Sequence, residues 1–324
     1  MDSTEQQLNI SGVPEEIQNK IVEDIDKSLE GRKTNVGELK VGVSVSDNED
    51  LELLGYSTLH IKDLTIEIVR YLLINHLTVV YGGDFRRDGY TRIFSELAYL
   101  YRPLQDNDRS SFENYSAFPI YLGLTKEDKL MLANANALLI KVPPPEGLGA
   151  DPDKFADNKT LASKYIVARS STKMREEMIA ATVARILVGG KLGSYGGKIP
   201  GVIEEASITL RRGKPLYLAG GFGGASRELA DALQGKPFSY QHNDFHQTAE
   251  YLAFVSYFNE QLPGDPIDPE KESAYFTSYT MEKLAQNNGL TVEENVRLFE
   301  TPHISEIIFL IFKGLQNKFA LPKH

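Results

Sequence analysis

Short apolar runs alternate with glycine-rich turns and amphipathic stretches along this chain, and this alternation strongly limits the folds that it can adopt. Five runs have the length and composition of buried strands, at 39–46, 77–81, 137–142, 185–189 and 214–219. Helical patterns lie between them, such as the face formed by Leu59, Leu64, Ile68 and Leu72. Strand, turn and helix in repetition build a parallel sheet, because right-handed crossovers return the chain to the same sheet. We therefore predict an α/β fold with a Rossmann-like, mostly parallel sheet flanked by helices, and helical additions at both ends.

The pattern also predicts how the chain is organised. Residues 1–38 form a helical extension with its helix at 14–29, residues 39–236 form the nucleotide-binding core, and residues 237–324 form a mostly helical region packed on that core. Further helices are expected at 89–100, 171–182, 202–210 and 226–233. Ser171 or Thr172 would cap the second of these. The run at 296–300 predicts a short edge strand, and Thr301-Pro302 predicts the start of a last helix.

Four strand-to-helix turns concentrate the small residues that a phosphate site needs. A helix N-terminus offers unpaired N–H groups and a partial positive charge, and glycine lets an anion approach the backbone. Neutral donors of this kind bind an anion even in a chain whose net charge is −10. The ligand-binding candidates in these turns are Ser44, Ser46, Gly82, Gly83, Asp84, Arg86, Gly189, Gly190, Gly201, Gly221, Phe222 and Gly223. Lys191 and Lys198 lie in the longest turn and are candidates to neutralise a phosphate.

The common nucleotide-binding fingerprints do not match these turns. Gly221 and Gly223 begin a GxGxxG pattern, but Ser226 takes the place of its third glycine. No acidic residue follows at the end of an adjacent strand about 20 residues on, which argues against a standard NAD dehydrogenase. The chain also lacks the GxxxxGK[ST] loop of nucleoside triphosphatases.

The amino-acid composition further limits the kinds of partner that we expect for this chain. The acidic balance argues against extended nucleic-acid binding, which depends on clustered lysine and arginine. The chain has no cysteine, and no apolar run approaches the ~18–20 residues of a membrane span. His242 and His246 have helical spacing around Asp244, but without a third ligand we predict no metal site and no cofactor. We expect a cytoplasmic protein that does not bind membranes.

Three segments together resemble the SLOG superfamily. They are MREEM at 174–178, RILVGG at 185–190 and PGVIEEA at 200–206. This superfamily includes the lonely-guy phosphoribohydrolases, the DprA-like proteins and the ligand-sensing region of TRPM channels. Lonely-guy enzymes carry an arginine on the helix before a strand and PGGxGTxxE after the strand, and 201–205 is similar to the GTxxE part. The chain departs from that pattern at Val202, which replaces the threonine, and in an insertion at 191–199. The residues YGGD at 81–84 and GYT at 89–91 look closest to prokaryotic relatives of the TRPM sensing domain.

The resemblance implies a pocket for a nucleotide or for an NAD- or ADP-ribose-derived molecule. It places Glu205 at the catalytic glutamate and Arg175 near the catalytic arginine. From the residues alone, Glu204 is expected to be solvated, and the alternatives are a solvated helix residue for Glu205 and a surface salt bridge for Arg175. A carboxylate can stabilise the oxocarbenium-like transition state of N-glycosidic cleavage, and arginine can grip a phosphate with two hydrogen bonds. Two functions follow: a sensor of a nucleotide signal, as in bacterial antiphage systems, or a hydrolase of a base–ribose bond. A scaffold whose ligand site has decayed is the third alternative. The loss of the threonine favours the sensor, and family analogy suggests a homo-oligomer.

Overall fold

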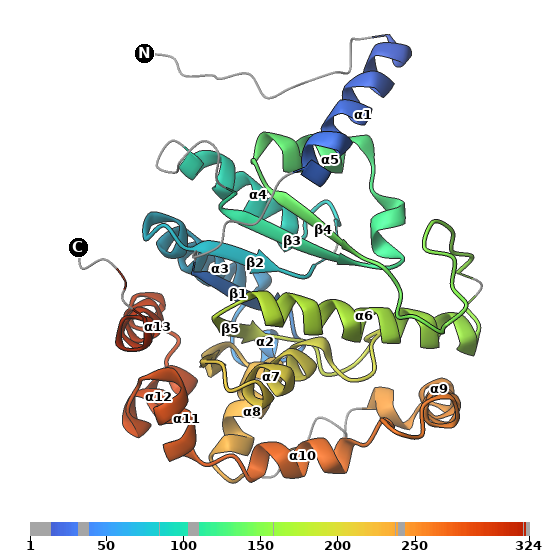
Figure 1. The fold of residues 1–324 in the computed structure, drawn as a ribbon. Coiled ribbons are helices and arrows are strands. Elements are labelled where there is room, and N and C mark those ends of the chain that lie inside the picture. The colour runs from blue at the N-terminus through green and yellow to red at the C-terminus, as the bar shows by residue number, and fades with distance from the viewer. Residues whose placement is uncertain are drawn as a thin grey trace, which may run out of the picture.

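A computed structural model describes residues 14–31, 39–83, 85–102, 110–157, 159–236, 238, 244–319 and 321. Its centre is a six-stranded sheet in the order β4-β3-β2-β1-β5-β6 (Figure 1). All neighbouring strands are parallel, which confirms the predicted fold class. The strands are β1 Lys40–Ser46, β2 Thr78–Tyr81, β3 Phe112–Ala117, β4 Leu138–Val142, β5 Ala184–Gly189 and β6 Leu216–Ala219.

The strand order creates a topological switch point beside β1. The chain moves outward from β1 through β2 and β3 to β4, and then returns to the other side of β1 to add β5 and β6. Connections therefore leave the carboxyl ends of β1 and β5 toward opposite sides. In open α/β sheets this divergence opens a crevice in which ligands bind.

Helices cover both faces of the sheet, and each face has its own apolar core. On one face lie α3 Thr58–Ile74, α4 Tyr90–Tyr101, α5 Lys126–Asn134 and α13 Ile304–Lys318. On the other face lie α6 Leu161–Ala181, α7 Gly201–Arg211 and α8 Gly224–Leu233. Alternate residues of β1 point to opposite faces, so Val41, Val43 and Val45 enter the first core. Gly42 and Ser44 then face α6 and α7.

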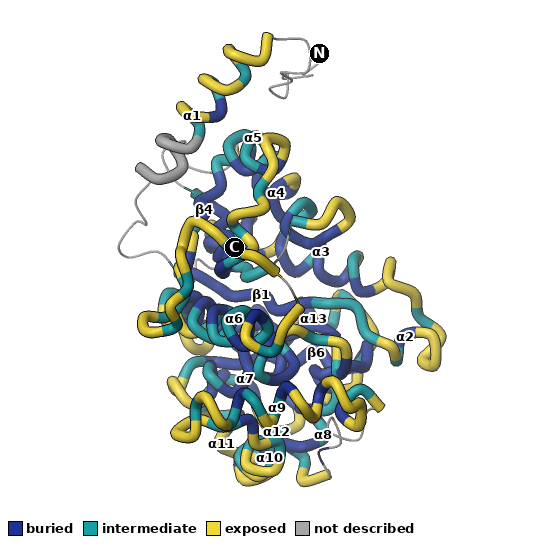
Figure 2. The backbone as a smooth tube through the Cα atoms, turned by 90° about the vertical axis from the view of Figure 1, so that its right-hand side faces the viewer, coloured by how far each residue is buried: buried dark blue, intermediate teal, exposed yellow. Residues whose placement is uncertain are grey.

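The remaining helices extend this core at both ends of the chain. The helix α1 Glu15–Gly31 packs on α5 and projects from the body of the molecule, and most of its residues from Glu15 to Ile25 are exposed (Figure 2). The helices α11 Met281–Asn288 and α12 Val292–Glu300 pack on β6, whereas α9 Ala249–Gln261 packs on α6 and α10 Pro269–Thr277 packs on α8. Short elements complete the chain: α2 Asp50–Leu53, η2 Ile120–Gly123, η3 Gly220–Phe222 and η5 Asp244–Gln247. Within the described residues, none of these helices combines the length and the apolar character needed to cross a membrane. The division of the chain at residues 38 and 236 stays a prediction.

Three local predictions were wrong, and one strand was missed. The strand β3 was not predicted, because its polar residues hide the apolar pattern. The helix at 171–182 is the second half of α6, which begins after Thr160; the Thr160 hydroxyl accepts a hydrogen bond from the Ser163 N–H. The segment 296–300 is helical rather than an edge strand. Thr291 and Glu294 form a capping box that starts α12 at Val292, and the helix continues to Glu300. Thr301 therefore ends α12, and His303 takes the N-cap position of α13.

Candidate functional site

A cleft of about 360 Å³ lies at the carboxyl ends of β1 and β2, beside the N-terminus of α7. This is the switch point of the sheet, and the volume lies within the range of small-molecule sites. The polar and glycine residues that line it come from four segments. They are Ser44, Ser46, Gly82, Gly83, Arg86, Ser171, Arg175, Lys191, Ser194, Gly196, Gly197, Gly201 and Glu205.

The carboxylate of Glu205 is held on both oxygens at the inner end of this cleft. Its Oε2 accepts hydrogen bonds from the Ser44 hydroxyl and from Nη1 of Arg185, which lies 2.7 Å away. Its Oε1 lies 3.5 Å from Nε of Arg175. Arg185 Nη1 also donates to the Ser44 hydroxyl over 2.9 Å. The Glu205 carboxylate in the cleft therefore lies between two guanidinium groups and a hydroxyl and is not a free carboxylate.

Arg185 is fully buried beneath the cleft, and the sequence analysis did not select it. Its place in β5 pairs it with Gly42 of β1. A side chain at Gly42 would place its Cβ 2.6 Å from Arg185 Nη2, so the glycine provides the space for the guanidinium. Burial lowers the pKa of Arg185, and the Glu205 carboxylate opposes that shift. The sequence could have indicated Arg185, because it is an arginine within an otherwise apolar strand and a buried charge requires a partner.

Arg175 connects α6 to the first turn of α7. Its Nη1 donates to Glu204 Oε2 over 2.5 Å, and the Thr172 hydroxyl donates to the other Glu204 oxygen over 2.5 Å. The expectation that Glu204 is solvated was therefore wrong: its residue is only 4% exposed. Gly201 permits this arrangement, because a Cβ there would lie 2.7 Å from Arg175 Nη2.

The turn after β5 brings the start of α7 close to the end of β1. Gly189 and Gly190 have φ angles of +61° and +106°, a region that favours glycine. The N–H of Gly190 donates to the Ser46 carbonyl, and the N–H of Lys191 donates to the Ser46 hydroxyl. No described side chain caps the N-terminus of α7, so its first N–H groups remain available to an anion in the cleft.

The structure brings together most of the residues selected from the sequence, but not all of them. Ser44, Ser46, Gly82, Gly83, Arg86, Arg175, Lys191, Gly201 and Glu205 line the cleft. The residues that do not line it are Gly189, Gly190, Lys198, Gly221, Phe222 and Gly223. Asp84 and His242 lie outside the described residues. The ligand roles assigned to these residues stay predictions.

Lys198, Gly190 and the turn at 221–223 have other structural contacts outside the cleft. Lys198 forms an ion pair with Asp265 over 2.5 Å. Gly190 packs against α7 and α8, since a Cβ there would lie 2.8–2.9 Å from their side chains. The turn at 221–223 leads into α8, but the carboxylate of Asp50 accepts the Gly224 N–H over 2.7 Å. A carboxylate of the chain itself therefore takes the place that a phosphate would take at that helix N-terminus.

Tyr195 is a lining residue that the sequence analysis did not select. It is the only aromatic residue in the glycine-rich turn at 189–201, which was the available signal. Its hydroxyl lies 2.9 Å from Nε2 of His246. Among the described residues, no group of three or more His, Asp or Glu side chains is placed to hold a metal ion.

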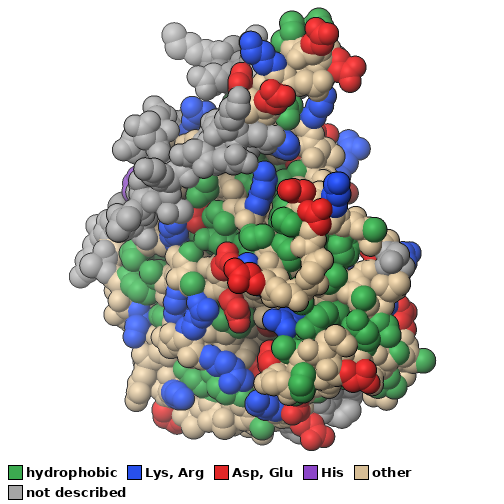
Figure 3. All heavy atoms as spheres, turned by 45° about the vertical axis from the view of Figure 1, so that its right-hand side comes forward, with side chains coloured by type: hydrophobic (Ala, Val, Ile, Leu, Met, Phe, Trp, Pro, Cys, Tyr) green, Lys and Arg blue, Asp and Glu red, His purple; other side chains and the backbone are tan. Residues whose placement is uncertain are grey.

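Charged side chains on the face shown in Figure 3 are interspersed, with Lys and Arg next to Asp and Glu.

Comparison with known proteins identifies the family of this chain. The search among curated proteins finds no match. The family model of SLOG cluster2 matches residues 35–298, which span the whole sheet and the cleft. The superfamily resemblance seen in the sequence is thereby confirmed, and the chain belongs to the SLOG cluster2 family.

Proposed function

We propose that the cleft binds a nucleotide or an NAD- or ADP-ribose-derived molecule, and that the protein is a sensor of this ligand. The observation that carries the proposal is the position of Arg175 and the uncapped N-terminus of α7 on one cleft at the switch point of the sheet. Membership of a SLOG family is consistent with this function. A closer relationship to the TRPM sensing domain, a homo-oligomeric state and a role in antiphage defence rest on the resemblance alone.

The phosphate of the ligand is expected at the start of α7. Gly201 and Val202 line the cleft there, and their helix presents N–H groups and the positive end of its dipole. Lys191 lies on the same rim and adds a cation. Arg175 supplies a guanidinium that can bind phosphate with two parallel hydrogen bonds.

The state of Glu205 favours sensing over hydrolysis. A hydrolase needs a carboxylate that can position water or stabilise a developing positive charge. Here Ser44 and Arg185 occupy one Glu205 oxygen, and Arg175 lies beside the other. Hydrolysis of a base–ribose bond is the alternative function, and it requires these contacts to open.

Two lysines of one loop provide a matched pair of variants. Isothermal titration with AMP, ADP-ribose and NAD should show binding to the wild-type protein. Lys191→Ala is expected to weaken it, whereas Lys198→Ala should not, because Lys198 lies outside the cleft and pairs with Asp265. A Tm increase in the presence of the same ligand would confirm that it binds the folded state.

Chromatography of the same mixtures separates the two functions. Binding without release of free base supports the sensor. Release of free base by the wild-type protein, but not by Glu205→Gln, would refute the sensor and support the hydrolase. If none of the three ligands binds or raises the Tm, both functions are refuted.

A further inference from the structure

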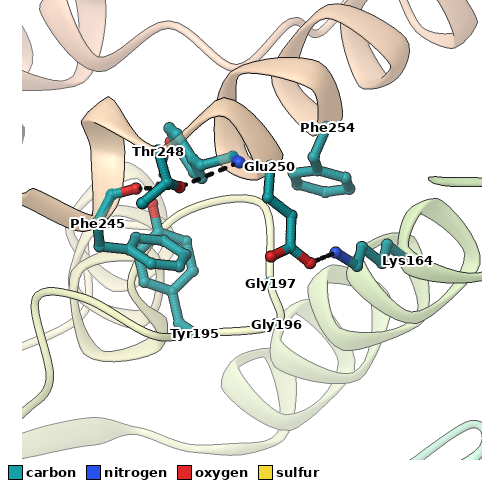
Figure 4. A pocket seen from close by; sticks show the side chains of 9 residues that line it. Lys164, Tyr195, Gly196, Gly197, Phe245, Thr248, Glu250 and Phe254 are labelled. Atoms are coloured by element: carbon teal, nitrogen blue, oxygen red, sulfur yellow. Dashed lines mark hydrogen bonds and ion pairs between the residues drawn. The ribbon is translucent and has the colours of Figure 1, made fainter. Parts of the chain in front are cut away.

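A second cavity, of about 210 Å³, lies next to the cleft between the glycine-rich turn, α6 and the start of α9 (Figure 4). Four aromatic rings line it: Tyr195, Phe245, Tyr251 and Phe254. We refer to it as the aromatic cavity. None of the functions considered above uses it.

Three of these rings form a fixed cluster. The ring centroids of Tyr195 and Phe245 lie 5.1 Å apart, and those of Phe245 and Tyr251 also lie 5.1 Å apart. The Tyr195 hydroxyl lies 2.9 Å from His246 Nε2 and donates to the Tyr251 hydroxyl over 3.1 Å. The rings are therefore held in place before any ligand enters, which lowers the entropic cost of stacking a planar group on them.

The aromatic cavity and the cleft share one wall. Tyr195, Gly196 and Gly197 line both of them. A Cβ at Gly197 would lie 3.2 Å from Arg175 Nη1, so only a glycine backbone separates the aromatic cavity from the Arg175 guanidinium. A Cβ at Gly196 would meet no atom within 4 Å, so the space beside the wall is open.

A polar edge completes the aromatic cavity. Lys164 of α6 forms an ion pair with Glu250 of α9 on the side away from Tyr195 and Phe245 (Figure 4). The Glu250 side chain is 77% exposed, so this pair is screened by water and easily exchanged. It offers an acceptor and a donor side by side, which matches the edge of a nucleobase that carries an amine next to a ring nitrogen.

We propose that the aromatic cavity receives the nucleobase of the nucleotide whose phosphate lies at Arg175 and the start of α7. The ligand then passes over Gly196 and Gly197, with its ribose at the shared wall. This inference rests on the proposed function and deepens it, because it assigns the base and the phosphate to separate parts of the site. It also gives the aromatic residue of the 191–199 insertion a role in recognition.

The test compares AMP with ribose 5-phosphate, which has the same phosphate and no base. Base–aromatic stacking strengthens binding by about fivefold or more, so the wild-type protein should bind AMP at least about fivefold more tightly. Phe245→Leu should lose most of this difference and leave the affinity for ribose 5-phosphate unchanged, and Phe245→Tyr should restore it. Tyr257→Leu is the control, because Tyr257 lies on α9, the helix that carries Tyr251 and Phe254, but does not line the aromatic cavity.

A second variant protects the test against a folding defect in Phe245→Leu. Glu250→Ala changes an exposed side chain and should weaken AMP binding without changing the affinity for ribose 5-phosphate. The inference is overturned if AMP and ribose 5-phosphate bind equally, or if both variants leave AMP affinity at the wild-type value. Absence of all nucleotide binding to the wild-type protein would instead refute the proposed function, and the inference with it.

Discussion

Replacing Arg185 with methionine tests how the floor of the cleft is held together. Arg185 is fully buried, and its Nη1 donates to Glu205 over 2.7 Å and to Ser44 over 2.9 Å. Removing one partner of a buried ion pair typically costs about 3–5 kcal/mol, because it leaves the other charge uncompensated. Glu205 would keep its contacts with Ser44 and Arg175. We therefore expect a loss at the lower end, about 3 kcal/mol.

This loss corresponds to a measurable change in Tm. With an unfolding entropy of about 2.1 cal/mol/K per residue, a chain of 324 residues has about 0.7 kcal/mol/K. The Tm of Arg185→Met should then fall by about 4 °C in calorimetry at pH 7 without ligand. Arg297→Met is the control: Arg297 binds both oxygens of Glu306, but its side chain is 54% exposed. The control should show a much smaller decrease.

A double-mutant cycle identifies the partner of Arg185. Glu205→Gln alone leaves the buried guanidinium without its carboxylate, whereas Arg185→Met/Glu205→Gln removes both charges. The double variant should therefore lose less than the two single variants together, by about 1–3 kcal/mol. Losses that add to within about 0.5 kcal/mol would refute the conclusion that this ion pair holds the cleft floor.

Three further predictions concern the turns and the last helices. Gly190→Ala should destabilise the protein by about 1–3 kcal/mol, measured by urea unfolding. The φ of Gly190 is +106°, and a Cβ there would overlap neighbouring side chains. A stability within about 0.5 kcal/mol of wild type would contradict this prediction. Gly201→Ala should displace the Arg175 guanidinium and weaken nucleotide binding while changing the Tm less than Gly190→Ala does; unchanged affinity would show that the close contact is not needed. The hydrogen bonds from Arg297 lower the pKa of Glu306, so its stabilising effect is present above its usual pKa and is lost as the pH falls through the lowered value. The Tm difference between wild type and Glu306→Gln should thus shrink between pH 7 and pH 3, and a constant difference would refute this.

The fold could be predicted from the sequence wherever a strand is apolar by itself. The strand β3 could not, because Glu113, Asn114 and Ser116 interrupt its pattern. In the folded chain Glu113 accepts a hydrogen bond from Lys40 over 2.6 Å, and the Asn114 amide donates to Thr91. These partners lie 73 and 23 positions away in the sequence. Local periodicity contains no information about such distant contacts.

The candidate site, too, could be predicted only in part from the sequence. The carboxyl ends of parallel strands meet at one edge, so Ser44, Gly82 and Gly201 could be predicted to lie close together. The turn at 221–223 has an equally suitable glycine pattern, yet Asp50 already occupies the helix N-terminus that it precedes. Asp50 and Gly224 are 174 positions apart. Turn composition therefore predicts where an anion can bind, but only the tertiary structure shows which of these places is open.

Arg175 links the two proposed functions, because any phosphate in the cleft must share it with Glu204 and Glu205. Arg175 belongs to α6 and both glutamates to α7, so a ligand that draws the guanidinium away weakens the connection between these helices. A ligand shifts a conformational equilibrium only by the difference in its affinity for the two states. A sensor therefore needs only that Arg175 exchange its contacts with Glu204 and Glu205 for contacts with the phosphate. A hydrolase also needs Glu205 to leave Arg185 and Ser44, and the cost of breaking that buried pair opposes it.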